Sequence, residues 1–251
     1  MIQSNRRSRP AIALMELPRP AHPDTLHRAA LLVMLATAVL LGGCGFNQNY
    51  SSAQHNDISL SADALSRDGV AFISPSTTTG QEEDKQTLAL VFARTLVSKR
   101  PDIRVVSLPE TLGAVNRAGL AREYNRMFED YGHSGILSRD TLQKIGKAAN
   151  ARYLVQLNLG GFSQESRGRF SMLGFRVYQT TRANIRLYVQ VWDTLDGSIA
   201  WEGVEELNLA QETGKEKSIT FTSVVEATAE NLIALLPPPR SSKVLSQTGL
   251  Q

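Results

Sequence analysis

The chain contains a single cysteine, Cys44, which directly follows the one long apolar segment of the sequence. A cysteine thiolate is a strong nucleophile, so this side chain could carry a covalent modification. The apolar segment, residues 29–41, has thirteen residues without a charge. This is shorter than the roughly 17–25 residues of a membrane-spanning helix, and it matches the apolar core of a secretory signal peptide. Position and chemistry therefore predict that Cys44 is a modification site, rather than a cysteine buried in a core.

The residues before Cys44 resemble the lipobox of bacterial lipoproteins. The match is Leu41, Gly42, Gly43 and Cys44, with small residues where a signal peptidase requires them. The resemblance implies cleavage before Cys44 and attachment of fatty acyl chains such as palmitate, to its sulfur and to the new amino terminus. Stable membrane anchoring takes two signals, such as two acyl chains, so a fully acylated Cys44 would hold the protein on a membrane.

The residue after the cysteine predicts which membrane this is. In enterobacterial sorting, an aspartate directly after the lipidated cysteine favours the inner membrane, whereas Gly45 does not. We therefore expect an outer-membrane location, with the protein facing the periplasm. The region before the apolar core is long for a signal peptide, which leaves open whether translation starts at Met1 or Met15.

Removal of the signal peptide changes the charge of the chain. Residues 1–43 carry five arginines and two acidic residues, and the remaining chain has 22 basic and 22 acidic residues. This balance argues against nucleic-acid binding, which needs a basic surface. With Cys44 lipidated, no thiol remains for a disulfide or a metal. His55 and His133 have no cysteine or second histidine nearby at metal-ligand spacing, so we expect no metal and no cofactor apart from the covalent lipid.

Composition divides the chain into four parts. Residues 1–43 are the predicted signal peptide, and residues 44–68 are polar without apolar periodicity, which predicts a lipidated flexible tether. Residues 69–236 carry the periodic apolar patterns of a folded domain. Residues 237–251 begin with three prolines and are predicted to be a disordered tail.

The folded part alternates strand and helix patterns before it becomes a run of strands. The expected strands are 69–74, 103–108, 152–162, 183–193 and 197–209, the last two joined at a turn by Asp196-Gly197. The expected helices start at Glu82, at a capping box of Ser107 and Glu110, at Ser138 and near Val225. This order predicts an α/β fold, in which helices pack on a mixed sheet. Segment 163–182 could be a loop or an extended hairpin.

Several segments resemble the curli-secretion-lipoprotein and TolB-N-terminal-like superfamily. The resemblance covers roughly residues 69–236, and its motifs are structural rather than catalytic. It implies an α/β envelope lipoprotein, and members include LpoB-like activators of penicillin-binding proteins and the curli secretion channel. The matching stretches are GVAFISPS (69–76), DIRVVSL (102–108), LQKIGKAANARYLVQLNLGGF (142–162) and IRLYVQVWDTLDGSIAWEG (185–203).

The strongest candidates for partner contact are the two tryptophans. Trp192 and Trp201 could anchor a protein partner, since tryptophan is enriched at binding hot spots. Packing within the predicted hairpin is the commoner role of such residues. No catalytic residue stands out, because the chain has no Gly-x-Ser-x-Gly nucleophile motif, although a triad assembled in space is compatible with any spacing.

These observations predict a non-enzymatic, lipid-anchored accessory protein of envelope biogenesis. Its partner would be a periplasmic or membrane protein, in cell-wall synthase activation or as a scaffold of an export system, and self-association into a homo-oligomer is left open. One alternative is a subunit of an oligomeric outer-membrane secretion channel. We expect no pore, because arginines interrupt segment 163–182 and no second hairpin of that length is available. A second alternative is a hydrolase of envelope polymers.

Overall fold

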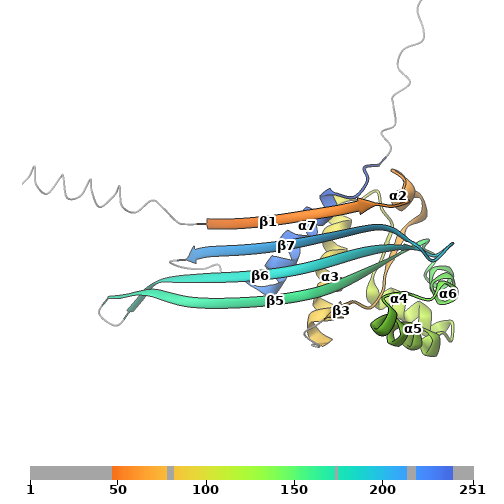
Figure 1. Cartoon of the computed structure of the whole chain (residues 1–251), viewed down its shortest axis with the longest axis horizontal. Coiled ribbons are helices and arrows are strands. Elements are labelled where there is room, and N and C mark those ends of the chain that lie inside the picture. The colour runs from red at the N-terminus through yellow and green to blue at the C-terminus, as the bar shows by residue number, and fades with distance from the viewer. Residues whose placement is uncertain (1–46, 78–81, 173–174, 214–218, 240–251) are drawn as a thin grey trace, which may run out of the picture. The chain divides into compact units, whose positions relative to one another are not determined.

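The computed structural model describes residues 47–77, 82–172, 175–213 and 219–239 (Figure 1). In these residues, seven strands form one mixed sheet with the order β1-β7-β6-β5-β2-β4, and β3 pairs with β5. The expected α/β fold with a mixed sheet is confirmed. The strands are β1 (Asn47–Asp57), β2 (Val70–Phe72), β3 (Ser76–Thr77), β4 (Val105–Val106), β5 (Tyr153–Met172), β6 (Phe175–Asp193) and β7 (Ile199–Thr213).

The sheet has an antiparallel part and a parallel part. Strands β1, β7, β6 and β5 pair antiparallel, whereas β2 pairs parallel with β4 and β5. Figure 1 shows that the antiparallel strands are long and extend beyond the helices, while α4, α5 and α6 gather near the end of the sheet that holds the β6–β7 turn. The helices are α2 (Ala64–Asp68), α3 (Glu82–Lys99), α4 (Leu108–Arg117), α5 (Ala121–Ser134), α6 (Arg139–Ala149) and α7 (Phe221–Ala234).

The structure corrects the prediction of a flexible tether over residues 44–68. Asn47–Asp57 forms β1, which pairs with β7 over its full length, and α2 follows at Ala64–Asp68. Nothing in the sequence pattern indicates β1, because backbone pairing holds the strand at the edge of the sheet and none of the side chains from Asn49 to Asp57 is buried. Backbone hydrogen bonds need no apolar alternation in the side chains.

The segment left open between loop and hairpin is an extended hairpin. Strands β5 and β6 pair from Tyr153↔Asp193 to Met172↔Phe175, with register shifts at three points. Strand β7 also runs four residues beyond the predicted end at Leu209, to Thr213. The predicted disordered tail, 237–251, lies outside the described residues from 240 onward.

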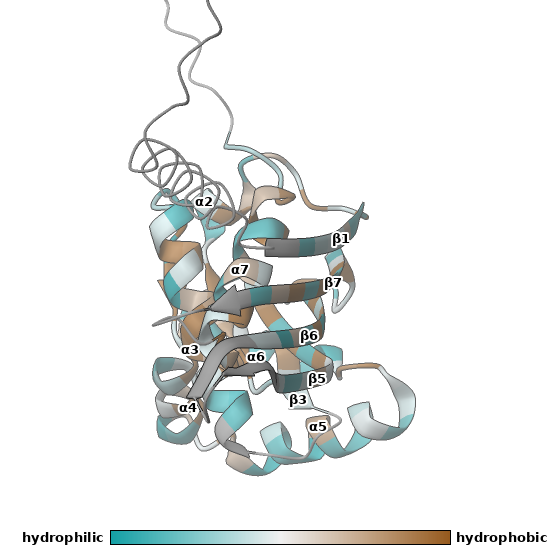
Figure 2. Cartoon of the chain, turned by 90° about the vertical axis from the view of Figure 1, so that its left-hand side faces the viewer, coloured by the Kyte–Doolittle hydropathy of each residue, from teal (hydrophilic) through white to brown (hydrophobic). Residues whose placement is uncertain are grey.

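Each face of the sheet carries its own hydrophobic core. Helices α3 and α7 cover one face, where Phe92 and Leu232 pack with strand residues such as Leu187. Helices α5 and α6 cover the other face near the β6–β7 turn, where Met127 and Ile145 belong to the second core. Figure 2 shows apolar residues on α3 and α7 and a mostly hydrophilic exterior on α5.

Local sequence signals place two helix starts and one helix end. Ser107 precedes α4, and its backbone N–H and hydroxyl both donate to the carboxylate of Glu110, at 2.8 and 2.7 Å. Ser138 precedes α6, which ends at Asn150 in the left-handed region, at φ 52°. Asparagine tolerates this conformation better than most residues, and these predictions are confirmed.

Candidate functional site

The predicted lipidation segment lies outside the described residues. Leu41, Gly42, Gly43, Cys44 and Gly45 all precede Asn47, the first residue that the structure describes. Within the described ranges, no helix combines the length and the apolar character needed to cross a bilayer. Lipidation at Cys44 therefore stays a prediction from the sequence.

Both tryptophans lie in the protein interior. Trp192 belongs to the core beneath α5 and α6, and Trp201 belongs to the core beneath α3 and α7. Neither indole N–H has a hydrogen-bond partner among the described residues. Their burial matches the packing role, and neither ring is exposed to a protein partner in this conformation.

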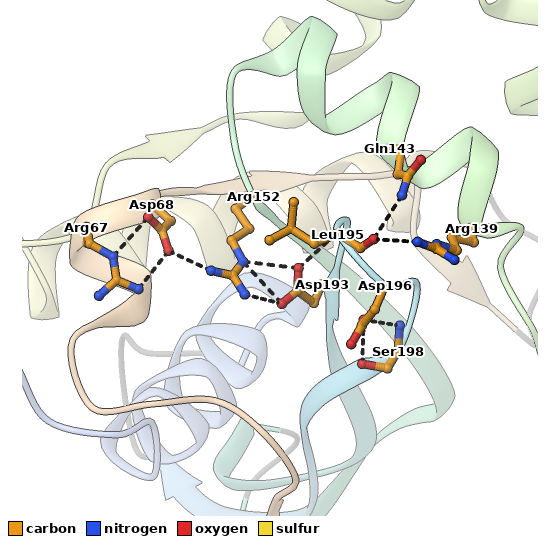
Figure 3. Close-up of polar contacts among 9 residues, drawn as sticks. All are labelled: Arg67, Asp68, Arg139, Gln143, Arg152, Asp193, Leu195, Asp196 and Ser198. Carbon is orange, nitrogen blue, oxygen red and sulfur yellow. Dashed lines mark hydrogen bonds and ion pairs between the residues drawn. The ribbon is translucent and has the colours of Figure 1, made fainter.

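The turn between β6 and β7 is held by an ion pair at its first residue. Arg152, just before β5, donates to both carboxylate oxygens of Asp193, with three N–H···O contacts of 2.7 to 3.1 Å (Figure 3). Asp193 also accepts the backbone N–H of Leu195 at 2.9 Å, within the turn. A buried carboxylate needs such partners, because an unpaired charge in the interior is costly.

A second acidic group extends this ion pair toward α2. The Nη1 atom of Arg152 lies 3.4 Å from a carboxylate oxygen of Asp68, the last residue of α2. Arg67 also donates to Asp68, at 3.0 and 3.1 Å. Hydrogen bonding to Asp193 raises the pKa of the Arg152 guanidinium above its usual value, with a smaller charge contribution from Asp68. The guanidinium thus joins α2, the start of β5 and the β6–β7 turn.

Helix α6 holds the same turn from another direction. The carbonyl of Leu195 accepts from Arg139 at 3.2 Å and from Gln143 at 2.9 Å (Figure 3). Asp196 accepts the backbone N–H and the hydroxyl of Ser198, at 2.9 and 2.7 Å. Hydrogen bonds from Ser198 lower the pKa of the Asp196 carboxyl. The backbone N–H of Thr194 donates to the carbonyl of Arg152 at 3.0 Å, so each residue from 193 to 196 has a fixed backbone or side-chain contact.

Glycine is required at the next position of the turn. Gly197 has φ 78°, in the region that side chains disfavour, and its N–H donates to the carbonyl of Asp193 at 2.9 Å. A Cβ atom at this position would lie 2.7 Å from the Cβ of Arg139. The turn can approach α6 this closely only because residue 197 has no side chain.

These contacts fix the backbone around an exposed apolar side chain. The side chain of Leu195 remains exposed, with 57% of the residue accessible, while its N–H and carbonyl are both engaged. A binding group held in one conformation loses little entropy on association. Chemically, the turn suits contact with an apolar pocket of a protein partner, and the segment from Asp193 to Ser198 is named here the Leu195 turn.

A cleft of about 800 Å³ opens elsewhere, between α5 and the loop after β2. There the hydroxyl of Tyr124 accepts the backbone N–H of Ser74 at 2.8 Å and donates to its Oγ at 2.9 Å. Burial raises the pKa of Tyr124 and of Tyr131, so both phenols stay protonated at neutral pH. The lining offers hydroxyl, amide and aromatic groups for hydrogen bonding and stacking.

The described histidines have other contacts. His55 lies 3.7 Å from a carboxylate oxygen of Asp57, and His133 faces the carbonyl of Glu129 at 2.8 Å. Among the residues that the structure describes, no group of three or more His, Cys, Asp or Glu side chains is arranged to hold a metal ion.

Sequence reasoning identified the Asp196-Gly197 turn but missed the residues that hold it. Arg152 contacts residues 41 and 84 positions away, and Arg139 reaches 56 positions along the chain. Such long-range contacts leave no periodic signal. The one available hint was the Asp-Gly pair, which marks a turn but does not reveal what packs against it.

Comparison with known proteins gives only distant likenesses. No protein-family model and no curated protein sequence matches the chain. Among solved structures, the PelC dodecamer from Paraburkholderia phytofirmans is similar at 11% identity and a TM-score of 0.41, covering 75% of this chain and 99% of that chain. The LpoB C-terminal domain from Salmonella enterica is 14% identical, with a TM-score of 0.31, over 59% of this chain and 86% of that domain. Lipoprotein GNA1162 from Neisseria meningitidis is 13% identical, with a TM-score of 0.34, over 66% and 98%.

Proposed function

We propose that this protein is a lipid-anchored accessory protein of the bacterial envelope that binds a protein partner through the Leu195 turn. Lipidation of Cys44 would hold it on the periplasmic face of the outer membrane. The function would be to position or activate a partner in envelope biogenesis, such as a cell-wall synthase or an export system. The proposal includes no catalytic step and no cofactor apart from the covalent lipid.

The observation that carries this proposal is the rigid presentation of Leu195. An exposed leucine by itself is ordinary on a protein surface. Here, however, the neighbouring backbone is held by Asp193 within the turn and by Arg139 and Gln143 from α6. A binding group whose backbone is already ordered loses less entropy on association, and binding energy at an interface is concentrated in a few well-packed side chains.

Charge around the turn supports a protein partner rather than a nucleic acid. Arg152 is neutralised by Asp193 and Asp68, and Arg139 shares its region with Asp196. The residues after the predicted cleavage site are balanced in charge, with 22 basic and 22 acidic side chains. Nucleic-acid binding needs unpaired basic groups on one face.

The test is site-specific photo-crosslinking in intact cells. A photoreactive residue replaces Leu195 in one strain and Leu90, on α3, in a second strain. The two leucines are matched controls, because their exposed fractions are 57% and 54%. We expect Leu195 to yield a discrete crosslinked protein that the Leu90 position does not yield.

A second arm separates binding from folding. Leu195→Ser should abolish the crosslink formed from a neighbouring turn position such as Asp196, while the amount of folded protein stays unchanged. Equal crosslinks from positions 195 and 90, or none from the turn, would show that the turn is not the binding surface. Release of soluble fragments from purified cell-wall material would instead favour a hydrolase.

A further inference from the structure

Strand β1 forms one edge of the sheet along its entire length. Its eleven residues, Asn47–Asp57, all pair with β7, in a register that runs without a break from Asn47↔Gln211 to Asp57↔Trp201. Within the described ranges, no other strand pairs with β1, and Figure 2 shows no labelled strand beyond it. About half of its backbone N–H and C=O groups therefore point away from β7 with no strand to receive them.

This edge lacks the features that normally protect an edge strand. Natural sheets shorten their edge strands, or place lysine, proline or a bulge in them, because an open edge readily pairs with another chain. Strand β1 has eleven residues, contains no lysine or proline and shows no register shift against β7. An unprotected edge of this length is a template for a further strand.

We propose that β1 pairs antiparallel with β1 of a second copy of this chain, joining the two sheets across a two-fold axis. Full overlap of the two strands places Ser52 opposite Ser52 of the second copy. Tyr50 then lies opposite Gln54, and Asn47 lies opposite Asp57. A two-fold contact between identical surfaces is the commonest way for a soluble protein to self-associate.

The charges of β1 favour this arrangement over a parallel one. The strand contains two ionisable side chains besides Tyr50, namely His55 and Asp57. In the antiparallel register they face Asn49 and Asn47, so no like charges oppose each other. A parallel register would instead bring each Asp57 beside the other, and like charges side by side on neighbouring strands are destabilising.

The remaining side chains of β1 can form hydrogen bonds with side chains of β1 in the second copy. Most are amides or hydroxyls, which can both donate and accept hydrogen bonds. Tyr50, at 64% exposure, is the largest side chain on this edge, and it would pack across the junction against Gln54. The contact is distinct from the Leu195 turn, and it depends on neither lipidation nor the proposed partner.

Cysteine crosslinking of the full-length protein in intact cells tests the register. Opposed residues in an antiparallel pair have Cα atoms about 4.5–5.5 Å apart, within the range of a disulfide or a short thiol crosslinker. Ser52→Cys should therefore give a covalent dimer by itself. Tyr50→Cys and Gln54→Cys should each fail alone, since the like positions lie four residues apart, or about 13 Å. The double variant Tyr50→Cys/Gln54→Cys should crosslink again.

The wild-type chain, whose single cysteine is Cys44, measures the background level of crosslinked dimer. Absence of a Ser52→Cys dimer, or equally strong dimers from Tyr50→Cys alone, would overturn the proposed pairing. A crosslinked product that contains a different protein would show that the edge receives a foreign strand, which also overturns the proposal of a second copy.

Two proline variants test the same contact without a crosslink. The N–H groups of neighbouring residues in a strand point to opposite sides, so only one of Ser52→Pro and Ala53→Pro removes an outward donor. That variant should be monomeric by sedimentation of the detergent-solubilised full chain, and it should lose only the stabilisation that dimerisation supplies. The other should lose stability, because it breaks the pairing with β7. A wild-type chain that sediments as a monomer would overturn the proposal.

Discussion

The guanidinium of Arg152 encloses the carboxylate of Asp193, with its Nη2 atom 2.7 Å from one oxygen and its Nε atom 3.1 Å from each. Only 8% of the Asp193 side chain is exposed, compared with 34% for Arg152. The pair therefore connects the start of β5 to the β6–β7 turn through a buried carboxylate and a partly exposed guanidinium. Its main role is to orient the turn, because the acid accepts the N–H of Leu195 as well.

Replacing Arg152 with alanine should destabilise the protein and loosen the Leu195 turn. The Asp193 carboxyl would be left in a buried position with the backbone N–H of Leu195 as its remaining donor. Loss of hydrogen bonds to a charged group typically costs about 1.5–3 kcal/mol, and we expect a loss of this size in the free energy of unfolding by urea. Partner crosslinking from position 195 should fall in parallel.

The matched control for this change is Arg126→Ala on α5. Arg126 is 82% exposed and lies 4.0 Å from Asp130, so its removal should cost less than about 1 kcal/mol. Equal losses for Arg152→Ala and Arg126→Ala would contradict a structural role for the Arg152–Asp193 pair.

Substitution of Gly197 should strain the same turn through the backbone. Gly197→Ala adds a methyl group at φ 78°, and its Cβ would lie 2.7 Å from the Cβ of Arg139. We expect a loss of about 1–3 kcal/mol in unfolding free energy, since left-handed backbone positions penalise side chains. Thermal unfolding of the full chain measures this loss.

Gly132→Ala is the control for this change, because it should raise stability rather than lower it. Gly132 lies within α5, and apart from its chain neighbours and the adjacent helix backbone, no atom lies within 4 Å of where its Cβ would be. Alanine there should stabilise the protein by about 0.5–1 kcal/mol, because glycine is a poor helix residue. If both substitutions shift the melting temperature in the same direction, the backbone argument for Gly197 does not hold.

Local signals in the sequence identified much of this fold. Ser138 and Asn150 bound α6 as expected, and Asp196-Gly197 forms the turn between two antiparallel strands. These features depend on contacts within a few residues, which composition and spacing reveal. The alternation from Ile185 to Val191 likewise predicted the buried face of β6.

The other parts of the fold depend on contacts between residues that lie far apart in the sequence. Strand β1 is polar, and it is held by backbone pairing with β7, about 150 residues away. The two tryptophans lie in different cores because Trp201 pairs with Val191, and Val191 and its neighbour Trp192 point to opposite faces of the sheet. Neither pairing partner nor register shift can be derived from alternation alone.

The buried carboxyl of Glu205 should make stability depend on pH. Burial raises its pKa, although Asn231 and Ser51 donate hydrogen bonds to it that act in the opposite direction. A carboxyl whose folded pKa is raised favours folding in its protonated form. Its favourable contribution is complete at low pH, and it is lost as the pH rises through the folded pKa.

Glu205→Gln should therefore stabilise the protein at pH 8 and have little effect near pH 4. The amide resembles the protonated acid, and its oxygen can still accept from Ser51 and Asn231. Urea unfolding at several pH values compares this variant with Glu206→Gln, an exposed neighbour on the same strand. A Glu205→Gln protein that is less stable than wild type at pH 8 would show that the charged form is favoured by its hydrogen bonds.

The expected cellular location depends on Cys44. Cys44→Ala removes the sulfur that would carry the diacylglycerol, and each buried CH₂ of an acyl chain contributes about 0.8 kcal/mol to membrane binding. The variant should keep its signal peptide and migrate as a larger species on a gel, since cleavage of lipoprotein signals follows lipidation. It should also incorporate no labelled palmitate.

Gly45→Asp should retain lipidation but move the protein to inner-membrane fractions, if this organism follows the enterobacterial sorting rule. Normal processing and anchoring of Cys44→Ala, or wild-type protein in the inner membrane, would contradict the expected location.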